Sequence, residues 1–177
     1  MCIRDRTKAE ALSTDTDWQD QALRQGVSYR ANVSASGGDE RTKFYISGSF
    51  LDEESIFVGN EYLKLSTRTN LEHKITDDLT IGTRLFFTYT DSSPVPVQNG
   101  LGKSNQNLPI HPVFKADGTY FNPLRSVRAS LDNWENNSKA RTFLANWFLN
   151  YKLADGLSYR TEYGINSINN NDASYLS

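Results

Sequence analysis

Alternation of apolar and polar residues over segments of about ten residues is the feature that most constrains the fold of this chain. It begins near Val27, where Val27, Tyr29 and Ala31 share one side and Ser28 and Arg30 the other. Side chains of a β-strand point alternately to its two faces, so this period of two predicts strands with one apolar and one polar face. Further segments of the same kind lie downstream, separated by turn-forming residues. The sequence therefore predicts an all-β fold, an antiparallel up-and-down meander of about six strands.

The connections between these segments alternate in length. The predicted turns at residues 37–40, near Asp77 and at residues 154–156 are short, whereas residues 52–60 form a longer connection and residues 91–138, approximately, a very long one. Tight turns at one end and long loops at the other are typical of outer-membrane barrels. A soluble meander has no reason to lengthen every second connection. Chance over five connections is the alternative explanation.

The first turn also predicts a register. A four-residue loop at 37–40 places Val33 opposite Phe44 and Ala31 opposite Ile46, so that apolar side chains meet across the two strands. A slip of one residue would move one of the two apolar sets to the other face, so the match supports the predicted hairpin.

Aromatic residues are predicted to gather at both ends of the strands. Tyr151 and Tyr159 oppose each other beside the 154–156 turn, and Tyr29, Phe50 and Tyr89 lie at the far ends of their strands. Amphipathic rings favour the boundary between membrane and water, so this placement resembles two aromatic girdles. The simpler explanation is that tyrosine favours strands in general.

A β-sandwich would show the same alternation, because its apolar face is buried against a second sheet. The predicted polar face carries Arg30, Arg68, Arg84, Arg160 and Glu162 in mid-strand. These side chains would be solvated in a sandwich, and in a barrel they would line a wet lumen or contact a plug domain. Their chemistry alone does not separate the two architectures.

Composition excludes several kinds of function. The chain has 19 Lys and Arg against 21 Asp and Glu, a net charge of -2, which does not provide the positive field that nucleic-acid binding needs. One cysteine and two histidines provide neither a disulfide framework nor an ordinary metal site. No nucleophile–base arrangement stands out, and many carboxylates fall in turns. We therefore expect no enzyme, no catalytic or metal-binding residue, no cofactor and no nucleic-acid partner.

Three elements in succession resemble a known family. A D-W-x-[DE] element leads into a strand that ends in S-x-S-G-G and a second strand rich in aromatic residues; an R-x-N-L element comes next, and then a P-x-x-P loop pattern that ends in G-x-[YF]. The residues that carry these elements are Asp17, Trp18, Asp20, Ser34, Ser36, Gly37, Gly38, Thr42, Phe44, Tyr45, Ser47, Ser49, Phe50, Arg68, Asn70, Leu71, Lys74, Ile75, Asp77, Leu79, Ile81, Gly82 and the segment from Pro109 to Tyr120. Together they resemble the SusC/RagA family of TonB-linked outer-membrane proteins. One departure is Ser55, where the family pattern has a glycine.

The resemblance implies that the chain is an internal piece of a far longer protein. Residues 14–177 would form early strands of a 22-stranded transmembrane β-barrel, with a long external loop at about 91–138. Residues 1–13 are expected to be a non-native or artefactual leader and linker, because the first six share no pattern with the rest of the chain. We also expect that the chain is unstable and prone to aggregate in isolation.

The implied function is active import of oligosaccharides or peptides across the cell outer membrane of a Bacteroidetes-type bacterium. The implied partners are a SusD-like surface lipoprotein, the TonB–ExbB–ExbD complex acting through the missing N-terminal part, and outer-membrane lipid. The alternative is a soluble β-sandwich module that binds glycans. A secreted hydrolase is a weaker third hypothesis, because no acid–base pair is placed.

Three aromatic residues of the long predicted loop are candidates for contact with the substrate: Tyr120, Phe121 and Trp134. Binding residues concentrate on loops, and an aromatic ring can stack on a sugar ring. Packing against the barrel rim is the alternative role for each of them.

Overall fold

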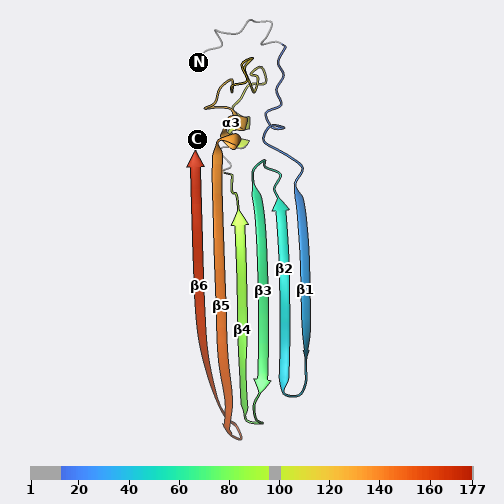
Figure 1. Ribbon diagram of the computed structural model, residues 1–177, viewed down its shortest axis with the longest axis vertical. Coiled ribbons are helices and arrows are strands. Elements are labelled where there is room, and N and C mark those ends of the chain that lie inside the picture. Colours follow the sequence, from blue (N-terminus) through green and yellow to red (C-terminus); the bar gives the residue numbers. More distant parts are fainter. Residues whose placement is uncertain (1–12, 96–100, 177) are drawn as a thin grey trace.

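Six antiparallel strands form one sheet in chain order (Figure 1). This computed structural model describes residues 13–95 and 101–176, so most of the predicted leader lies outside the described residues. The strands are β1 (Val27–Gly38), β2 (Thr42–Glu54), β3 (Glu61–Lys74), β4 (Leu79–Ser92), β5 (Trp134–Ala154) and β6 (Leu157–Leu176). Each strand pairs with its neighbours along the chain. The predicted all-β meander is confirmed.

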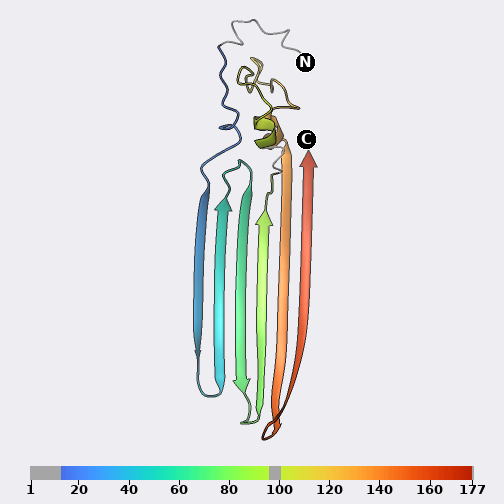
Figure 2. The same cartoon turned by 180° about the vertical axis from the view of Figure 1, so that it is seen from behind.

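The two ends of the sheet differ, as both views show (Figures 1 and 2). Three tight turns lie at one end, and the 55–60 and 93–133 connections lie at the other. The longest connection contains the short helices α2 (Leu101–Ser104) and α3 (Val127–Asp132). This connection is shorter than expected, because residues 134–140 continue β5 by pairing with residues 170–176 of β6. No helix in the described ranges is long and apolar enough to cross a membrane.

The predicted register of β1 on β2 is wrong. Val33 lies opposite Gly48 and Ala31 lies opposite Phe50, where Phe44 and Ile46 were expected. The pairing differs by an even number of residues, and an even shift keeps every side chain on its predicted face. The assignment of faces therefore holds although the paired residues differ.

The cause of this difference is the position of the first turn, which lies two residues later in the sequence than predicted. β1 continues to Gly38, which pairs with Lys43. The Asp39 carboxylate accepts hydrogen bonds from the backbone N–H of Arg41 at 2.8 Å and of Thr42 at 2.6 Å. An Asp side chain that accepts hydrogen bonds from the two N–H groups that follow favours a turn that starts at that residue.

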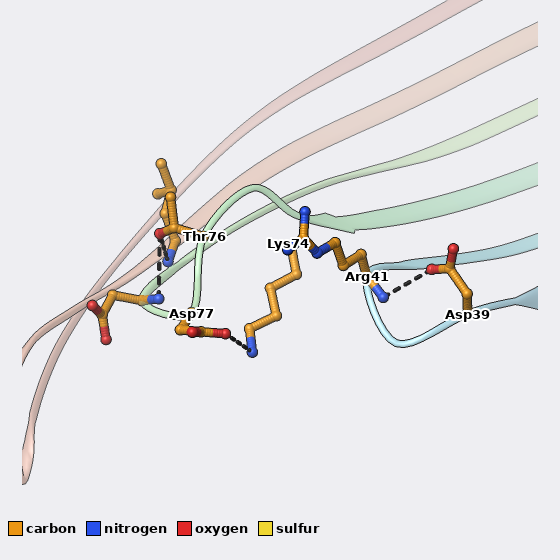
Figure 3. A network of polar contacts seen from close by, with 7 residues as sticks. Asp39, Arg41, Lys74, Thr76 and Asp77 are labelled. Atoms are coloured by element: carbon orange, nitrogen blue, oxygen red, sulfur yellow. Dashed lines mark hydrogen bonds and ion pairs between the residues drawn. The ribbon is translucent and has the colours of Figure 1, made fainter.

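The first two tight turns are linked to each other (Figure 3). The backbone N–H of Lys74 donates to the Arg41 carbonyl at 2.7 Å. The Lys74 ammonium group forms an ion pair with Asp77 at 2.9 Å. These contacts align the two turns, at which β1 and β3 end and β2 and β4 begin.

One face of the sheet is apolar over most of its height, and we call it the apolar face. It carries large side chains that are each at least 39% exposed, namely Ile46, Leu65, Leu71, Ile81, Phe87, Phe143, Trp147, Tyr151, Tyr159, Tyr163 and Ile165. Tyr151 pairs with Tyr159 beside the last turn, as predicted. The other, polar face carries Arg68, Arg84 and Arg160. The part of the chain that the structure describes forms a single sheet, without a second layer over the apolar face.

Candidate functional site

A small apolar cluster supports the long connection at the loop end of the sheet. Trp18 and Ala22, from the segment before β1, pack with Val127 of α3. Trp18 is 5% exposed, and both Ala22 and Val127 are fully buried. Burying one large apolar side chain contributes about 1.5–3 kcal/mol, so this cluster holds two distant parts of the sequence together.

Hydrogen bonds strengthen the same junction. We call residues 13–26 the leading segment. Thr16 donates from its backbone N–H to the Pro109 carbonyl at 2.8 Å and from its hydroxyl to the His111 carbonyl at 2.7 Å. The Trp18 indole N–H donates to the Leu108 carbonyl at 3.0 Å. The leading segment is therefore fixed to the first half of the long connection.

The leading segment also contacts the β2–β3 connection. The backbone N–H of Val58 donates to the Ala22 carbonyl at 3.1 Å, and that of Arg24 to the Ile56 carbonyl at 2.7 Å. The Arg24 guanidinium lies 3.7 Å from Glu54 and 3.8 Å from Glu61. One segment thus joins both long connections of this end.

Tyr120 lies within this ordered connection. Its hydroxyl donates to the Asp132 carboxylate, which also accepts from the Arg128 guanidinium at 3.0 Å. Its ring packs on Phe114 with 5.1 Å between ring centroids. The bond to Asp132 raises the pKa of the Tyr120 hydroxyl, because ionising it would place two negative charges together. The hydroxyl hydrogen of Tyr120 therefore has a structural partner in Asp132.

Phe121 follows Tyr120 and packs on another ring of the same connection. Its ring centroid lies 5.4 Å from that of His111. Its backbone N–H donates to the Val113 carbonyl at 3.0 Å. Tyr120 and Phe121 therefore occupy the same short loop structure, and their role in binding substrate stays a prediction.

Trp134 is the first residue of β5 and pairs with Leu176. Its side chain lies outside the described part of the structure. The role of Trp134 in binding substrate therefore stays a prediction.

Sequence reasoning missed Arg128 and Asp132, which hold Tyr120 in place. They stand four residues apart on α3, and this spacing places two side chains on one side of a helix. Ser126 caps α3, its hydroxyl accepting from the Ala129 N–H at 3.3 Å. A serine at the N-cap position, followed by an Arg–Asp pair at this spacing, is the signal that would have predicted this helix.

The polar face has a second ordered cluster, built on an aromatic ring. Phe148 is 6% exposed and lies across from Gly82 of β4. The guanidinium groups of Arg84 and Arg160 lie 5.0 and 4.9 Å from the centre of its ring. Arg160 also forms an ion pair with Glu162. Among the described residues no group of three or more His, Cys, Asp or Glu side chains could hold a metal ion.

These features define a class of protein: a meander sheet with two chemically different faces, tight turns at one end and structured connections at the other. No family model matches the chain. The chain is 26% identical to the TonB-dependent receptor P3 of Formosa agariphila over 88% of its own length and 17% of that protein. It is 29% identical to the TonB-dependent receptor P39 of the same organism, over 85% of the chain and 15% of the relative.

Two further similarities are to SusC and to the RagAB importer. The TonB-dependent receptor SusC of Bacteroides thetaiotaomicron is 28% identical over 42% of the chain and 7% of SusC. The solved structure of the RagAB peptide importer in its closed-closed state has the same fold, with a TM-score of 0.75 and 18% sequence identity. The similarity covers 92% of this chain and 20% of the matched chain of that structure. The predicted resemblance to SusC/RagA-type TonB-dependent proteins is confirmed. The chain spans less than a fifth of the length of its curated relatives.

Proposed function

We propose that this chain is part of the wall of an outer-membrane β-barrel that imports nutrients in a TonB-dependent way. The observation that carries the proposal is a bounded apolar band on the apolar face. It begins at the Tyr151–Tyr159 pair and ends where Tyr89 of β4 lies opposite Arg141 of β5. Beyond Arg141, on the same face, Lys139 forms an ion pair with Asp91 at 3.4 Å.

The height of this band fits a membrane. Ten residue steps separate Arg141 from Tyr151 on β5, and at a rise of about 3.3 Å and a tilt of about 40° they span roughly 25 Å. This is the height of the apolar belt of outer-membrane barrels, about 25 Å. Tyrosines at both borders support the assignment, because amphipathic rings favour the membrane boundary.

The single sheet favours a barrel wall over the β-sandwich alternative. A sandwich covers its apolar face with a second sheet, and the described residues form one layer. In the barrel, the tight turns would be periplasmic and the 93–133 connection external. Residues 14–177 would then be early strands of a 22-stranded barrel, the size that the family resemblance implies.

The proposed cargo is an oligosaccharide or a peptide. The similarity to SusC and RagA supports a SusD-like surface lipoprotein as partner, TonB–ExbB–ExbD as the energy source and outer-membrane lipid as the surroundings. Binding and release of such a cargo need no bond chemistry. Tyr120, Phe121 and Trp134 remain the proposed contacts on the external side.

The first test is to identify the full-length gene and follow its product. Density-gradient fractionation should place the protein in the outer membrane, and deleting the gene should abolish uptake of one oligosaccharide or peptide. Trp134→Ala and Tyr120→Ala in the full-length protein should then reduce uptake at normal surface levels. Recovery of the full-length product in the soluble fraction would favour the glycan-binding module.

A further inference from the structure

The apolar face has a hollow of about 450 Å³ near the tight-turn end of the sheet. Short side chains at Thr83 and Thr161 lie there among large ones from Leu71, Ile81, Trp147, Leu149 and Tyr163. The rings of Trp147 and Tyr163 stack with 6.1 Å between their centroids. No Asp, Glu, Lys or Arg is found among the described residues that line the hollow. Its chemistry therefore fits an apolar ligand.

The hollow lies in the half of the apolar band that is nearer to the tight turns. Four residue steps separate Trp147 from Tyr151 at the border of the band, and at a rise of about 3.3 Å and a tilt of about 40° they span roughly 10 Å. With periplasmic turns, this half faces the hydrocarbon of the inner leaflet. An acyl chain in the hollow contacts side chains on its flanks as well as beneath it, so dispersion attraction favours the hollow over level parts of the face.

Polar and charged groups begin where the hollow ends. His73 lines the hollow on the side of the turns and contacts the Thr42 hydroxyl through Nδ1 at 2.8 Å. The next residue, Lys74, lies against Arg41 of the first turn, whose carbonyl accepts its backbone N–H (Figure 3). Asp77 pairs with Lys74 at 2.9 Å, and its pKa is lowered by this ammonium group and, less strongly, by the Arg41 guanidinium. Both cations therefore lie at the border of the band, the level of lipid headgroups.

The charges of the first two turns have both signs. Residues 39–41 and 74–78 carry two cations and four carboxylates, an excess that repels a headgroup with only negative charge. Arg41 forms no ion pair with a described carboxylate, and Glu40 and Asp78 form none with a described cation. A headgroup with a phosphate and an ammonium group matches both signs, because the phosphate can pair with Arg41 and the ammonium with Glu40 or Asp78.

We propose that the hollow and the adjoining turns form a binding site for one phospholipid of the inner leaflet, with a zwitterionic phosphate–ammonium headgroup. One acyl chain lies in the hollow beside Trp147 and Tyr163, and the phosphate lies at Arg41. This inference rests on the proposed function, because only in an outer-membrane barrel does the apolar face meet lipid.

The test uses the full-length protein, purified in detergent and freed of lipid. Native mass spectrometry measures its affinity for phosphatidylethanolamine and for phosphatidylglycerol, both with two palmitoyl chains. Thr83→Leu fills the hollow with an apolar side chain, and Arg41→Gln removes the unpaired cation. The controls are Thr67→Leu, the same change on the apolar face outside the hollow, and Arg125→Gln, which removes an exposed cation at the other end of the sheet.

The wild type is expected to prefer phosphatidylethanolamine by about threefold, the usual scale of exposed ion pairs. Thr83→Leu should weaken binding of both lipids by at least about fivefold, because overfilling a packed site costs at least this much. Arg41→Gln should weaken binding by about threefold, and both controls should bind as the wild type does. If Thr83→Leu does not fold, Thr161→Leu fills the same hollow from an exposed position and is judged by the same measurement.

Unchanged affinity in Thr83→Leu, in a protein that resides in the outer membrane, would overturn the site and leave the proposed function standing. Equal affinity for the two lipids, or unchanged affinity in Arg41→Gln, would overturn the headgroup assignment. A wild-type dimer that Thr83→Leu separates would assign the hollow to a second copy of the protein and overturn the lipid assignment. A full-length protein absent from the outer membrane would overturn the proposed function, and the site with it.

Discussion

The contact between Gly82 and Phe148 shows how one missing side chain shapes the polar face. A Cβ atom at Gly82 would lie 2.3 Å from the Phe148 ring and 2.8 Å from the Leu71 carbonyl oxygen. The ring occupies the space that a side chain would need, and in turn positions Arg84 and Arg160. An aromatic ring that covers a glycine on the next strand is a known way to stabilise a sheet.

Gly82→Ala should therefore destabilise the full-length protein by about 1–3 kcal/mol, the usual cost of overpacking. Denaturant unfolding in detergent measures the effect. Gly164→Ala is the control, because its nearest neighbour would lie at 3.7 Å, an ordinary contact distance. Equal stability of the two variants would contradict this account of Gly82.

Asp39 makes the first turn sensitive to pH. The backbone N–H groups of Thr42 and Arg41 bind its carboxylate and hold its pKa below the usual value of 3.8. A depressed pKa in the folded state stabilises the turn above the unfolded value, and this contribution is lost as the pH falls through the folded pKa. Asp39→Ala should thus lower the unfolding midpoint at pH 6, and the gap to wild type should close below pH 3.8.

Denaturant titrations of the full-length protein at pH 6 and pH 3 measure this gap. Glu40→Ala removes an exposed carboxylate from the same turn and serves as the control. A gap for Asp39→Ala that is equally large at both pH values would contradict the assigned role of its charge.

At the scale of elements, period-two alternation was sufficient to predict all six strands and the faces of their residues. The β1–β2 register was not predicted, because it depends on whether the turn starts at Asp39, which alternation does not encode. The fold of the long connection was also missed. Its order comes from Trp18, which is more than a hundred residues before Val127 in the sequence, and pairing patterns within one segment cannot report such a contact. The bond from Tyr120 to Asp132 was also missed, because it joins two residues of an irregular connection in which alternation does not apply.

The leading segment should control the order of the long connection. Trp18→Ala removes a buried ring and a hydrogen bond, and such changes cost about 3–5 kcal/mol. Limited proteolysis within residues 105–125 should therefore accelerate by about a hundredfold or more. Leu124→Ala is the control, because Leu124 is 85% exposed on the same connection. An unchanged cleavage rate in Trp18→Ala would show that other contacts hold the connection.

At the scale of the whole molecule, the apolar face predicts contact with lipid. Trp147 is 42% exposed near the middle of the apolar band, whereas Trp18 is buried in the loop cluster. In vesicles of lipids with brominated acyl chains, the bromine atoms should quench the fluorescence of Trp147. Trp147→Phe should remove most of the tryptophan fluorescence of residues 13–176 that the brominated lipids quench. Trp18→Phe should leave that quenched fluorescence in place. Quenching that is equal in wild type and Trp147→Phe would contradict a lipid-facing position.

The same face predicts the behaviour of the chain by itself. β1 and β6 each have one unpaired edge in the described sheet, and large apolar side chains are exposed. The isolated chain should aggregate in water and disperse in detergent, which light scattering measures. A soluble monomer with a sharp, cooperative unfolding transition would count against both predictions.

The nearest-neighbour pairing of the strands has a consequence for how the sheet forms. Four of its five junctions join strands that are separated by fewer than ten residues. Closing a loop costs conformational entropy, and this cost grows with loop length. The strands of these hairpins can therefore pair, starting from their turns, at a small entropic cost. Only β4 and β5 must meet across the 93–133 connection. We therefore expect two local units, β1–β4 and β5–β6, to form first as the chain emerges, with their joining as the slow kinetic step.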